Sequence, residues 1–333
     1  MESASDVLKR IFGTSQQSSM GADIVDQTQR LRNIEAATFS KPKQTRVIAV
    51  ANQKGGVGKT TTTVNISAAL ASRGLSVLVI DMDPQGNAST ALGVKHSPGE
   101  ASVYDVVEAR LTLDEVMQTC PDFPTLQVVP ASIDLSGAEL ELADIQQRQF
   151  VLKENLRSLL NEQSERFDFV FIDCPPSLGL LVLNSLCAAQ EVLIPIQAEY
   201  YALEGLGQLL HTISLVQQSY NRQLQVSTML VTMFDKRTLL SREVFEEIQK
   251  HYPKIVLKTT IPRAVKISEA PSFNQSIIAY DPKGAGSIAY LEAALEITNR
   301  QQKSAQHNRA SKSNTDAQDT VSIELETAEG TQE

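Results

Sequence analysis

The sequence predicts an α/β fold, a mostly parallel, doubly wound sheet with helices on both faces. Short apolar runs, which suit strands buried on both faces, alternate along the chain with longer stretches that suit helices. Several of these runs end in an aspartate or a glycine-rich turn, and such sheets bind ligands at the carboxyl ends of their strands. The length of 333 residues and the hydrophobic content of 42% are sufficient for one large domain of this kind.

The composition argues against several classes of protein. The three cysteines, Cys120, Cys174 and Cys187, show no CxxC pairing, which disfavours a disulfide scaffold or a zinc site and favours a reducing, cytoplasmic location. No apolar run reaches the roughly 18 to 20 residues that span a bilayer, and no signal peptide is visible. The net charge of −9 argues against a protein that coats DNA over its whole surface, so any contact with nucleic acid requires a local basic patch.

The two ends of the chain are polar. Residues 1–45 are predicted to be a mostly disordered arm, with one short amphipathic helix from Val7 to Phe12. We interpret that helix as transient in preference to a membrane or partner anchor. Residues 302–333 are predicted to be a disordered tail that becomes acidic and carries no amphipathic apolar stripe. The ordered domain is therefore expected over residues 46–301.

The first apolar run of that domain leads into a glycine-rich segment. The run Val47–Val50 precedes residues 51–62, and a helix follows, which is the layout of a phosphate-binding loop. Glycines let backbone N–H groups turn toward one anion, and the helix adds the positive end of its dipole. Lys59 would then reach the β- and γ-phosphates, and the Thr60 hydroxyl would bind Mg²⁺. The nucleotide-binding residues predicted in the loop are Gly55, Gly56, Val57, Gly58, Lys59, Thr60 and Thr61.

The loop departs from the general phosphate-loop pattern at two positions. Gln53 stands where that pattern has glycine, and a second lysine, Lys54, precedes the glycines. The resulting K-G-G-x-G-K-T-T resembles the deviant phosphate loop of the ParA/MinD family of ATPases. The resemblance implies that Lys54 crosses a dimer interface and contacts the phosphates of the partner's nucleotide.

The next apolar run, Val77–Ile80, ends in two aspartates. A carboxylate at the carboxyl end of a parallel strand points into the crevice where such sheets bind ligands, although Asp, Pro and Gly also form ordinary turns. The segment D-x-D-P-Q-G-N, which begins at Asp81, resembles the second signature of the ParA family. By that resemblance Asp83 orients or activates the attacking water, and Asp81 helps to organise the Mg²⁺ side of the site.

The middle of the chain predicts elements without a catalytic role. We expect short helical pieces over residues 102–117, a strand over 126–130, and helices over 137–144 and 149–165. Their charged side chains, such as Glu139, are interpreted as a solvated surface.

A third strand end completes the phosphate site. Residues 167–172 are apolar apart from Asp168 and lead to Asp173, the form of a Walker B strand whose carboxylate holds Mg²⁺. The segment Asp-Cys-Pro-Pro-Ser again resembles the ParA family. Cys174 has no histidine near it in sequence, so we interpret it as a small buried residue rather than a nucleophile.

The remaining elements follow in alternation. Helices are expected over residues 178–189, 202–220 and 286–301, and strands over 191–196 and 226–233. Residues 197–205 match the ParA family, but their chemistry indicates no specific role.

Two later segments also resemble ParA sequences. The resemblance places Met233 and Pro262 beside the adenine of the nucleotide. It also implies DNA binding without sequence preference by Arg237 and Lys266. Lysine at the second position keeps the charge but loses the bidentate fork of arginine. Without the resemblance, both side chains would be interpreted as ordinary surface cations.

The resemblance extends over residues 46–300 and rests on three phosphate-site motifs in order. It implies an Mg²⁺-dependent ATP hydrolase for DNA partition, whose ATP-bound homodimer binds nucleoid DNA. A ParB-type centromere-binding protein would stimulate hydrolysis and release the double-stranded DNA. One alternative is a membrane-associated positioning ATPase of the MinD type, which the tail disfavours because it lacks an amphipathic helix. Another is a regulator that binds nucleotide but hydrolyses little, and the cargo, chromosome or plasmid, stays open.

Overall fold

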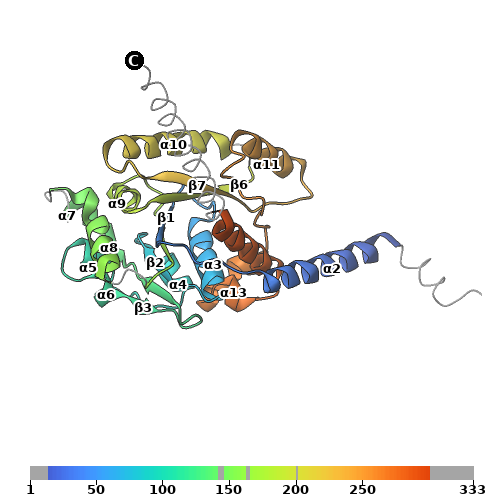
Figure 1. Ribbon diagram of the computed structural model, residues 1–333, viewed down its shortest axis with the longest axis horizontal. Helices are drawn as coiled ribbons and strands as arrows, with labels where there is room; N and C mark the ends of the chain where they lie inside the picture. Colours follow the sequence, from blue (N-terminus) through green and yellow to red (C-terminus); the bar gives the residue numbers. More distant parts are fainter. Residues whose placement is uncertain (1–13, 142–145, 163–165, 200–201, 301–333) are drawn as a thin grey trace, which may run out of the picture.

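The computed structural model describes residues 14–141, 146–162, 166–199 and 202–300 of the chain (Figure 1). Its centre is a seven-stranded sheet in the order β3-β4-β2-β5-β1-β6-β7. Every neighbouring pair is parallel except β3 with β4, so the predicted fold class is confirmed. The strands are β1 (Arg46–Val50), β2 (Val77–Asp81), β3 (Gln118–Thr119), β4 (Leu126–Val129), β5 (Phe169–Asp173), β6 (Glu191–Gln197) and β7 (Gln225–Thr232).

Two clusters of buried apolar side chains cover the two faces of the sheet. Along β1, Val47 and Ala49 belong to one cluster, whereas Ile48 and Val50 belong to the other, because successive side chains of a strand point to opposite faces. The first cluster includes residues of α5 (Val103–Val107), α6 (Leu113–Val116), α7 (Ala138–Glu141), α8 (Val151–Glu162), α9 (Leu180–Ala188), α10 (Ala202–Ser219) and α11 (Leu239–His251). The second includes residues of α2 (Thr14–Ala36), α3 (Lys59–Ala71), α4 (Asn87–Ala91), α12 (Val265–Glu269), α13 (Ile277–Tyr280) and the last described helix, residues 285–300.

The N-terminal arm corrects the sequence prediction. Residues 14–36, expected to be disordered, form the helix α2, which extends away from the domain toward its N-terminal end (Figure 1). Its C-terminal part packs on the second cluster, where Ile34 is 2% exposed and Leu31 lies against buried side chains. Arg30 also forms an ion pair of 2.6 Å with Glu292 of the last helix. The spacing of Leu31 and Ile34 therefore provides an apolar stripe that the composition of the arm concealed. The predicted helix at residues 7–12 and the predicted tail at 302–333 lie outside the described residues.

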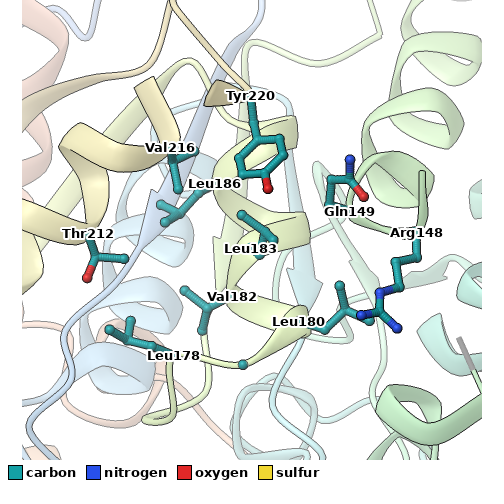
Figure 2. A pocket seen from close by; sticks show the side chains of 11 residues that line it. Arg148, Gln149, Leu178, Leu180, Val182, Leu183, Leu186, Thr212, Val216 and Tyr220 are labelled. Carbon is teal, nitrogen blue, oxygen red and sulfur yellow. The ribbon is translucent and has the colours of Figure 1, made fainter. Parts of the chain in front are cut away.

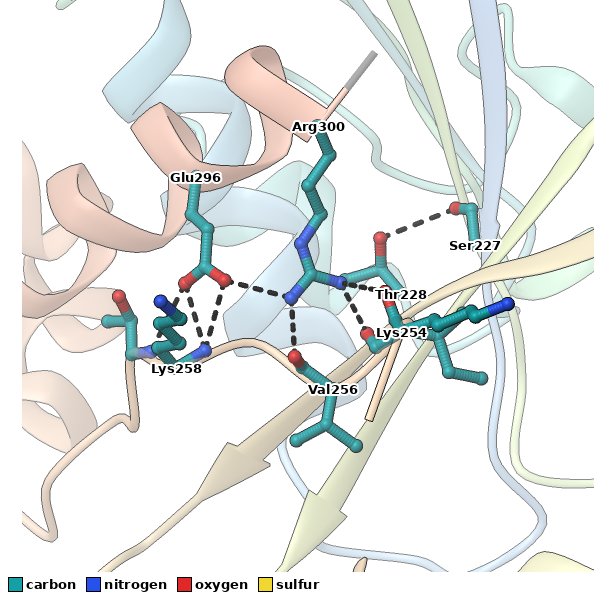
Figure 3. A network of polar contacts seen from close by, with 9 residues as sticks. Ser227, Thr228, Lys254, Val256, Lys258, Glu296 and Arg300 are labelled. Atoms are coloured by element: carbon teal, nitrogen blue, oxygen red, sulfur yellow. Dashed lines mark hydrogen bonds and ion pairs between the residues drawn. The ribbon is translucent and has the colours of Figure 1, made fainter. Parts of the chain in front are cut away.

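The last helix is tied to the segment that follows α11 (Figure 3). The Arg300 guanidinium donates to the carbonyls of residues 254 to 256 and pairs with Glu296 at 2.8 Å. The Glu296 carboxylate accepts hydrogen bonds from the backbone N–H groups of Lys258 and Thr259. This network fixes the chain just before Pro262, the residue predicted to lie beside the nucleotide base. None of the helices within the described residues is long and apolar enough to cross a lipid bilayer.

Candidate functional site

Three predicted motifs meet at the carboxyl ends of the central strands of the sheet. In the strand register Asp173 of β5 lies beside Val50 of β1 on one side and beside Asp81 of β2 on the other. The glycine-rich loop follows β1 directly and leads into α3. The phosphate loop and the two aspartate-ending strands are therefore adjacent, at the carboxyl ends of parallel strands where ligands bind such sheets.

The glycine-rich loop has the backbone of an anion-binding site. Gly56 and Gly58 have φ of 74° and 89°, in the left-handed region that glycine adopts without strain. The Thr232 hydroxyl at the end of β7 donates to the Val57 carbonyl at 2.8 Å and fixes the loop from the other side. The first backbone N–H groups of α3 have no carbonyl partner within the helix, so they can donate to a phosphate.

The two lysines of the loop have different surroundings. Lys59 is 7% exposed, and its ammonium donates to the Lys54 carbonyl at 3.4 Å. Burial lowers the pKa of Lys59, and the charge of Asp173 opposes that shift, so a bound phosphate would stabilise the charged form. The Lys54 ammonium instead pairs with Glu199 at 2.8 Å, and both side chains are well exposed. Glu199, which also accepts a hydrogen bond from Gln197, has no signal in the sequence that links it to the loop.

Asp173 is the buried carboxylate of the site. Its two oxygens accept hydrogen bonds from the Thr60 hydroxyl at 2.8 Å and from the Thr63 hydroxyl at 2.7 Å. Burial, followed by the charge of Asp81, raises the pKa of Asp173 to about 8. A buried carboxylate beside a hydroxyl fits Mg²⁺, which prefers hard oxygen ligands and retains bound water. The structure brings Thr60 and Asp173 together as predicted partners of the metal, and it adds Thr63, which the sequence analysis missed.

The turn after β2 is organised by Asp81. Its carboxylate accepts hydrogen bonds from the Ser89 N–H at 2.9 Å, the Ser89 hydroxyl at 2.7 Å and the Asp83 N–H at 3.2 Å. Burial raises the pKa of Asp81 to about 6. Asp83 is 7% exposed, and its carboxylate accepts from the Gln85 N–H at 3.0 Å. Asp81 therefore holds the turn that carries Asp83, whereas its direct contact with Mg²⁺ stays a prediction.

Met233 and Pro262 come together in a cavity beside the phosphate loop. The backbone N–H of Phe234 donates to the Ile261 carbonyl at 2.9 Å, and Phe234 forms a bridge with Pro262. The cavity has a volume of about 200 Å³. Its lining consists of Gly58, Thr61, Thr232, Met233, Ile261, Pro262, Arg263, Ala264, Ile267, Ser268 and Tyr290. A cavity with both apolar and polar lining that shares Gly58 and Thr61 with the phosphate loop suits the base of a bound nucleotide.

The two predicted DNA-binding cations are exposed and already paired. Arg237 contacts Asp235 through two nitrogens, at 2.9 and 2.8 Å, and this contact lowers the pKa of Asp235 to about 2. Lys266 lies 3.0 Å from Asp281. Water and salt screen exposed pairs of this kind, so both cations can exchange their carboxylates for other anions.

Two other features of the domain do not fit a phosphate site. A cavity of about 440 Å³ between α9, α10 and Gln149 is lined mainly by leucine and valine, such as Leu183 and Val216 (Figure 2). Cys174 is fully buried, and burial raises its pKa to about 12, which keeps the thiol protonated and inert. The interpretation of Cys174 as a buried structural residue agrees with this geometry.

Comparisons with known proteins agree with this geometry. A family model for the AAA domain matches residues 45–226. The chain is 47% identical to the chromosome partitioning protein ParA of Myxococcus xanthus, over 77% of this chain and 88% of that protein. It is also 47% identical to the sporulation initiation inhibitor protein Soj of Bacillus subtilis, over 76% of this chain and 98% of that protein.

Solved structures show the same fold. The structure of cobyrinic acid a,c-diamide synthase from Mycobacterium smegmatis, with bound ADP and magnesium, is 41% identical and has a TM-score of 0.64. The match covers 75% of this chain and 92% of that chain. The Pyrococcus furiosus cell division ATPase MinD is 26% identical, with a TM-score of 0.63, over 76% of this chain and 98% of that chain.

Proposed function

The chain belongs to the ParA/Soj family of chromosome-partitioning ATPases, and from this premise we propose that it is a switch on DNA driven by ATP. It is an ATP-hydrolysing phosphate-loop enzyme, with ATP and Mg²⁺ as its cofactors. In the proposed cycle ATP joins two subunits into a dimer, the dimer binds duplex DNA without sequence preference, and hydrolysis dissolves it.

The convergence of the phosphate loop with Asp83 and Asp173 carries the proposal. Lys59 would bind the β- and γ-phosphates, while Thr60 and Asp173 would hold Mg²⁺. Mg²⁺ neutralises charge on the phosphate oxygens, so the work of the protein in phosphoryl transfer is positioning and electrostatic stabilisation. Asp83, at the turn beside this site, would orient the attacking water.

Lys54 connects the phosphate site to the dimer. Its contact with Glu199 is exposed, and such pairs contribute about 0 to 1 kcal/mol. Lys54 can therefore leave Glu199 for the phosphates of the partner subunit's nucleotide at little cost. ATP would then stabilise the dimer by supplying the charge that Lys54 binds across the interface.

Arg237 and Lys266 would provide the contact with DNA. The bridge between Phe234 and Pro262 joins the segment that carries Arg237 to the segment that carries Lys266. A dimer would therefore present four such cations. Phosphate contacts of this kind require no base recognition and weaken with salt. A ParB-type centromere-binding protein would stimulate hydrolysis, and the names of the relatives favour a chromosome as the cargo. The protein would then be cytoplasmic and associated with the nucleoid.

Light scattering tests the dimer. With ATP and Mg²⁺, the Asp83→Ala variant is expected to be a dimer, and Lys54→Ala in the same background is expected to be a monomer that still binds ATP. Glu199→Gln, which frees Lys54 from its carboxylate, should dimerise at an equal or lower protein concentration. A Lys54→Ala variant that dimerises like its parent would rule out the contact across the interface.

A further inference from the structure

One side chain outside the motifs lies directly on the turn that carries Asp83. Gly86 in this turn has φ of 63°, and a Cβ placed on it would lie 2.7 Å from Nδ1 of His96. The imidazole therefore occupies the space that any other residue at position 86 would fill. His96 is half-buried and follows α4 in the chain.

A hydrogen-bonded chain connects His96 to the turn. The Thr90 hydroxyl lies 3.1 Å from the Gly86 carbonyl and 2.9 Å from Nε2 of His96. The Gly86 carbonyl also accepts from the Thr90 N–H at 2.9 Å. With the Thr90 hydroxyl donating to the same carbonyl, Nε2 of His96 is the donor to Thr90, which corresponds to the tautomer protonated at Nε2. The Gly86 N–H in turn donates to the Asp83 carbonyl at 2.9 Å. The chain thus runs from His96 through Thr90 and Gly86 to Asp83.

His96 is itself held in place. The side-chain amide of Gln118 in β3 both accepts from the Lys95 N–H at 3.0 Å and donates to the Lys95 carbonyl at 2.8 Å. The Val94 N–H donates to the Ser89 carbonyl at 3.1 Å. The residues on the N-terminal side of His96 are thereby fixed to the edge of the sheet and to α4, so the imidazole can act as a rigid support.

The turn therefore has two supports. Asp81 holds Ser89, whose hydroxyl also accepts from the Ala131 N–H at 3.1 Å. This first support fixes the turn to β2 and to the end of β4. His96 and Thr90 act on the other side, at the Gly86 carbonyl that ends the turn.

We propose that His96 is a positioning residue for ATP hydrolysis, acting through Thr90 to fix the turn that places Asp83 against the attacking water. The proposal rests on the role given above to Asp83. His96 contacts neither the phosphate loop nor the base cavity among the described contacts, so its loss should leave nucleotide affinity unchanged. A small displacement of a catalytic group lowers kcat strongly, by up to about a hundredfold for 1 Å.

Two amide side chains of different length test the hydrogen bond between His96 and Thr90. Gln can place an amide N–H near the position of Nε2, whereas the shorter Asn cannot reach Thr90. His96→Asn and Thr90→Val are expected to lower kcat about tenfold, with KM for ATP changed by less than about twofold. His96→Gln and Thr90→Ser, which keep the donor and the hydroxyl, should retain most of the parental kcat. Turnover is measured on the full chain, with ATP affinity and the thermal midpoint measured on each variant.

A double-mutant cycle provides the second readout. Because His96 acts through Thr90, combining His96→Asn with Thr90→Val should cause no further loss beyond that of either single variant. Equal losses in His96→Gln and His96→Asn would overturn the proposal, as would losses that multiply in the double variant. Asp83→Ala separates the role of Asp83 from the positioning role of His96. If this variant keeps the parental turnover, the role of Asp83 is wrong and the inference about His96 fails with it. If Asp83→Ala loses turnover but His96→Asn and Thr90→Val do not, only the positioning role of His96 is wrong.

Discussion

Asp173 at the end of β5 and Arg237 beyond the end of β7 were both predicted from short motifs, but their surroundings differ. Asp173 is fully buried, lies beside Asp81 in the strand register and accepts hydrogen bonds from two threonine hydroxyls. Arg237 is exposed and paired with Asp235, two residues away. The phosphate site is therefore fixed by the backbone of the sheet, whereas the cationic surface depends on contacts that solvent and salt can replace.

The largest effect is expected in the phosphate site. Asp173→Asn removes the negative charge that would hold Mg²⁺ beside Thr60, and ATP turnover should fall about 10²- to 10³-fold. The matched control is Asp168→Asn, a carboxylate just before the same strand that accepts from the Ser76 N–H. Its turnover should equal that of the parent once folding is verified. Similar losses in both variants would mean that turnover reports on the stability of β5 and not on the site.

A smaller effect is expected at the cationic surface. Arg237→Glu with Lys266→Glu should weaken retention on duplex DNA about ten- to a hundredfold and reduce its dependence on salt, because phosphate contacts are lost. Lys41→Glu with Lys250→Glu changes the net charge equally, but Lys41 precedes β1 and Lys250 lies at the far end of α11. If the control variant loses DNA as strongly, net charge and not this surface is responsible.

The third effect concerns stability and pH. The pKa of Asp173 is raised in the folded protein, so between its unfolded value near 3.8 and about 8 the folded state binds the extra proton. The free energy of unfolding of the protein without nucleotide or metal should therefore fall as pH rises through this window, and Asp81 acts in the same direction. From pH 6 to pH 8 we expect a loss of about 2 to 3 kcal/mol, measured by urea unfolding with a chelator present.

The same Asp173→Asn variant checks that pH dependence. It cannot ionise at position 173, so its stability should change less between pH 6 and pH 8. At pH 8 the variant should be at least as stable as the parent although it is inactive. This is expected where a buried charge destabilises the fold but is needed for activity. An unchanged slope in the variant would place the responsible group elsewhere.

The sequence predicted the motifs of the phosphate site but not the side chains that hold those motifs in place. The loop from Lys54 to Thr61 and the aspartates at positions 81, 83 and 173 lie in contiguous motifs at strand ends, so strand pairing alone brings them together. The partners of these residues were not predicted: Glu199 lies 145 positions from Lys54, and no pattern connects them. Ser89 and His96 meet the turn through hydrogen bonds of individual side chains, which composition and periodicity do not encode. Helix α2 was missed because, among the side chains of this helix that the structure describes, the docking contacts come from Leu31 and Ile34 near its end, and two apolar residues in a polar arm give little signal.

Nucleotide-dependent retention on DNA tests the central claim most directly. The full chain would be applied to sequence-random duplex DNA with ATP, with ADP and without nucleotide over a series of salt concentrations, using Asp83→Ala to hold the ATP state. We expect retention with ATP only, lost steeply as salt rises. Equal retention in all three states, or none in any of them, would contradict a switch in which ATP assembles the DNA-binding surface.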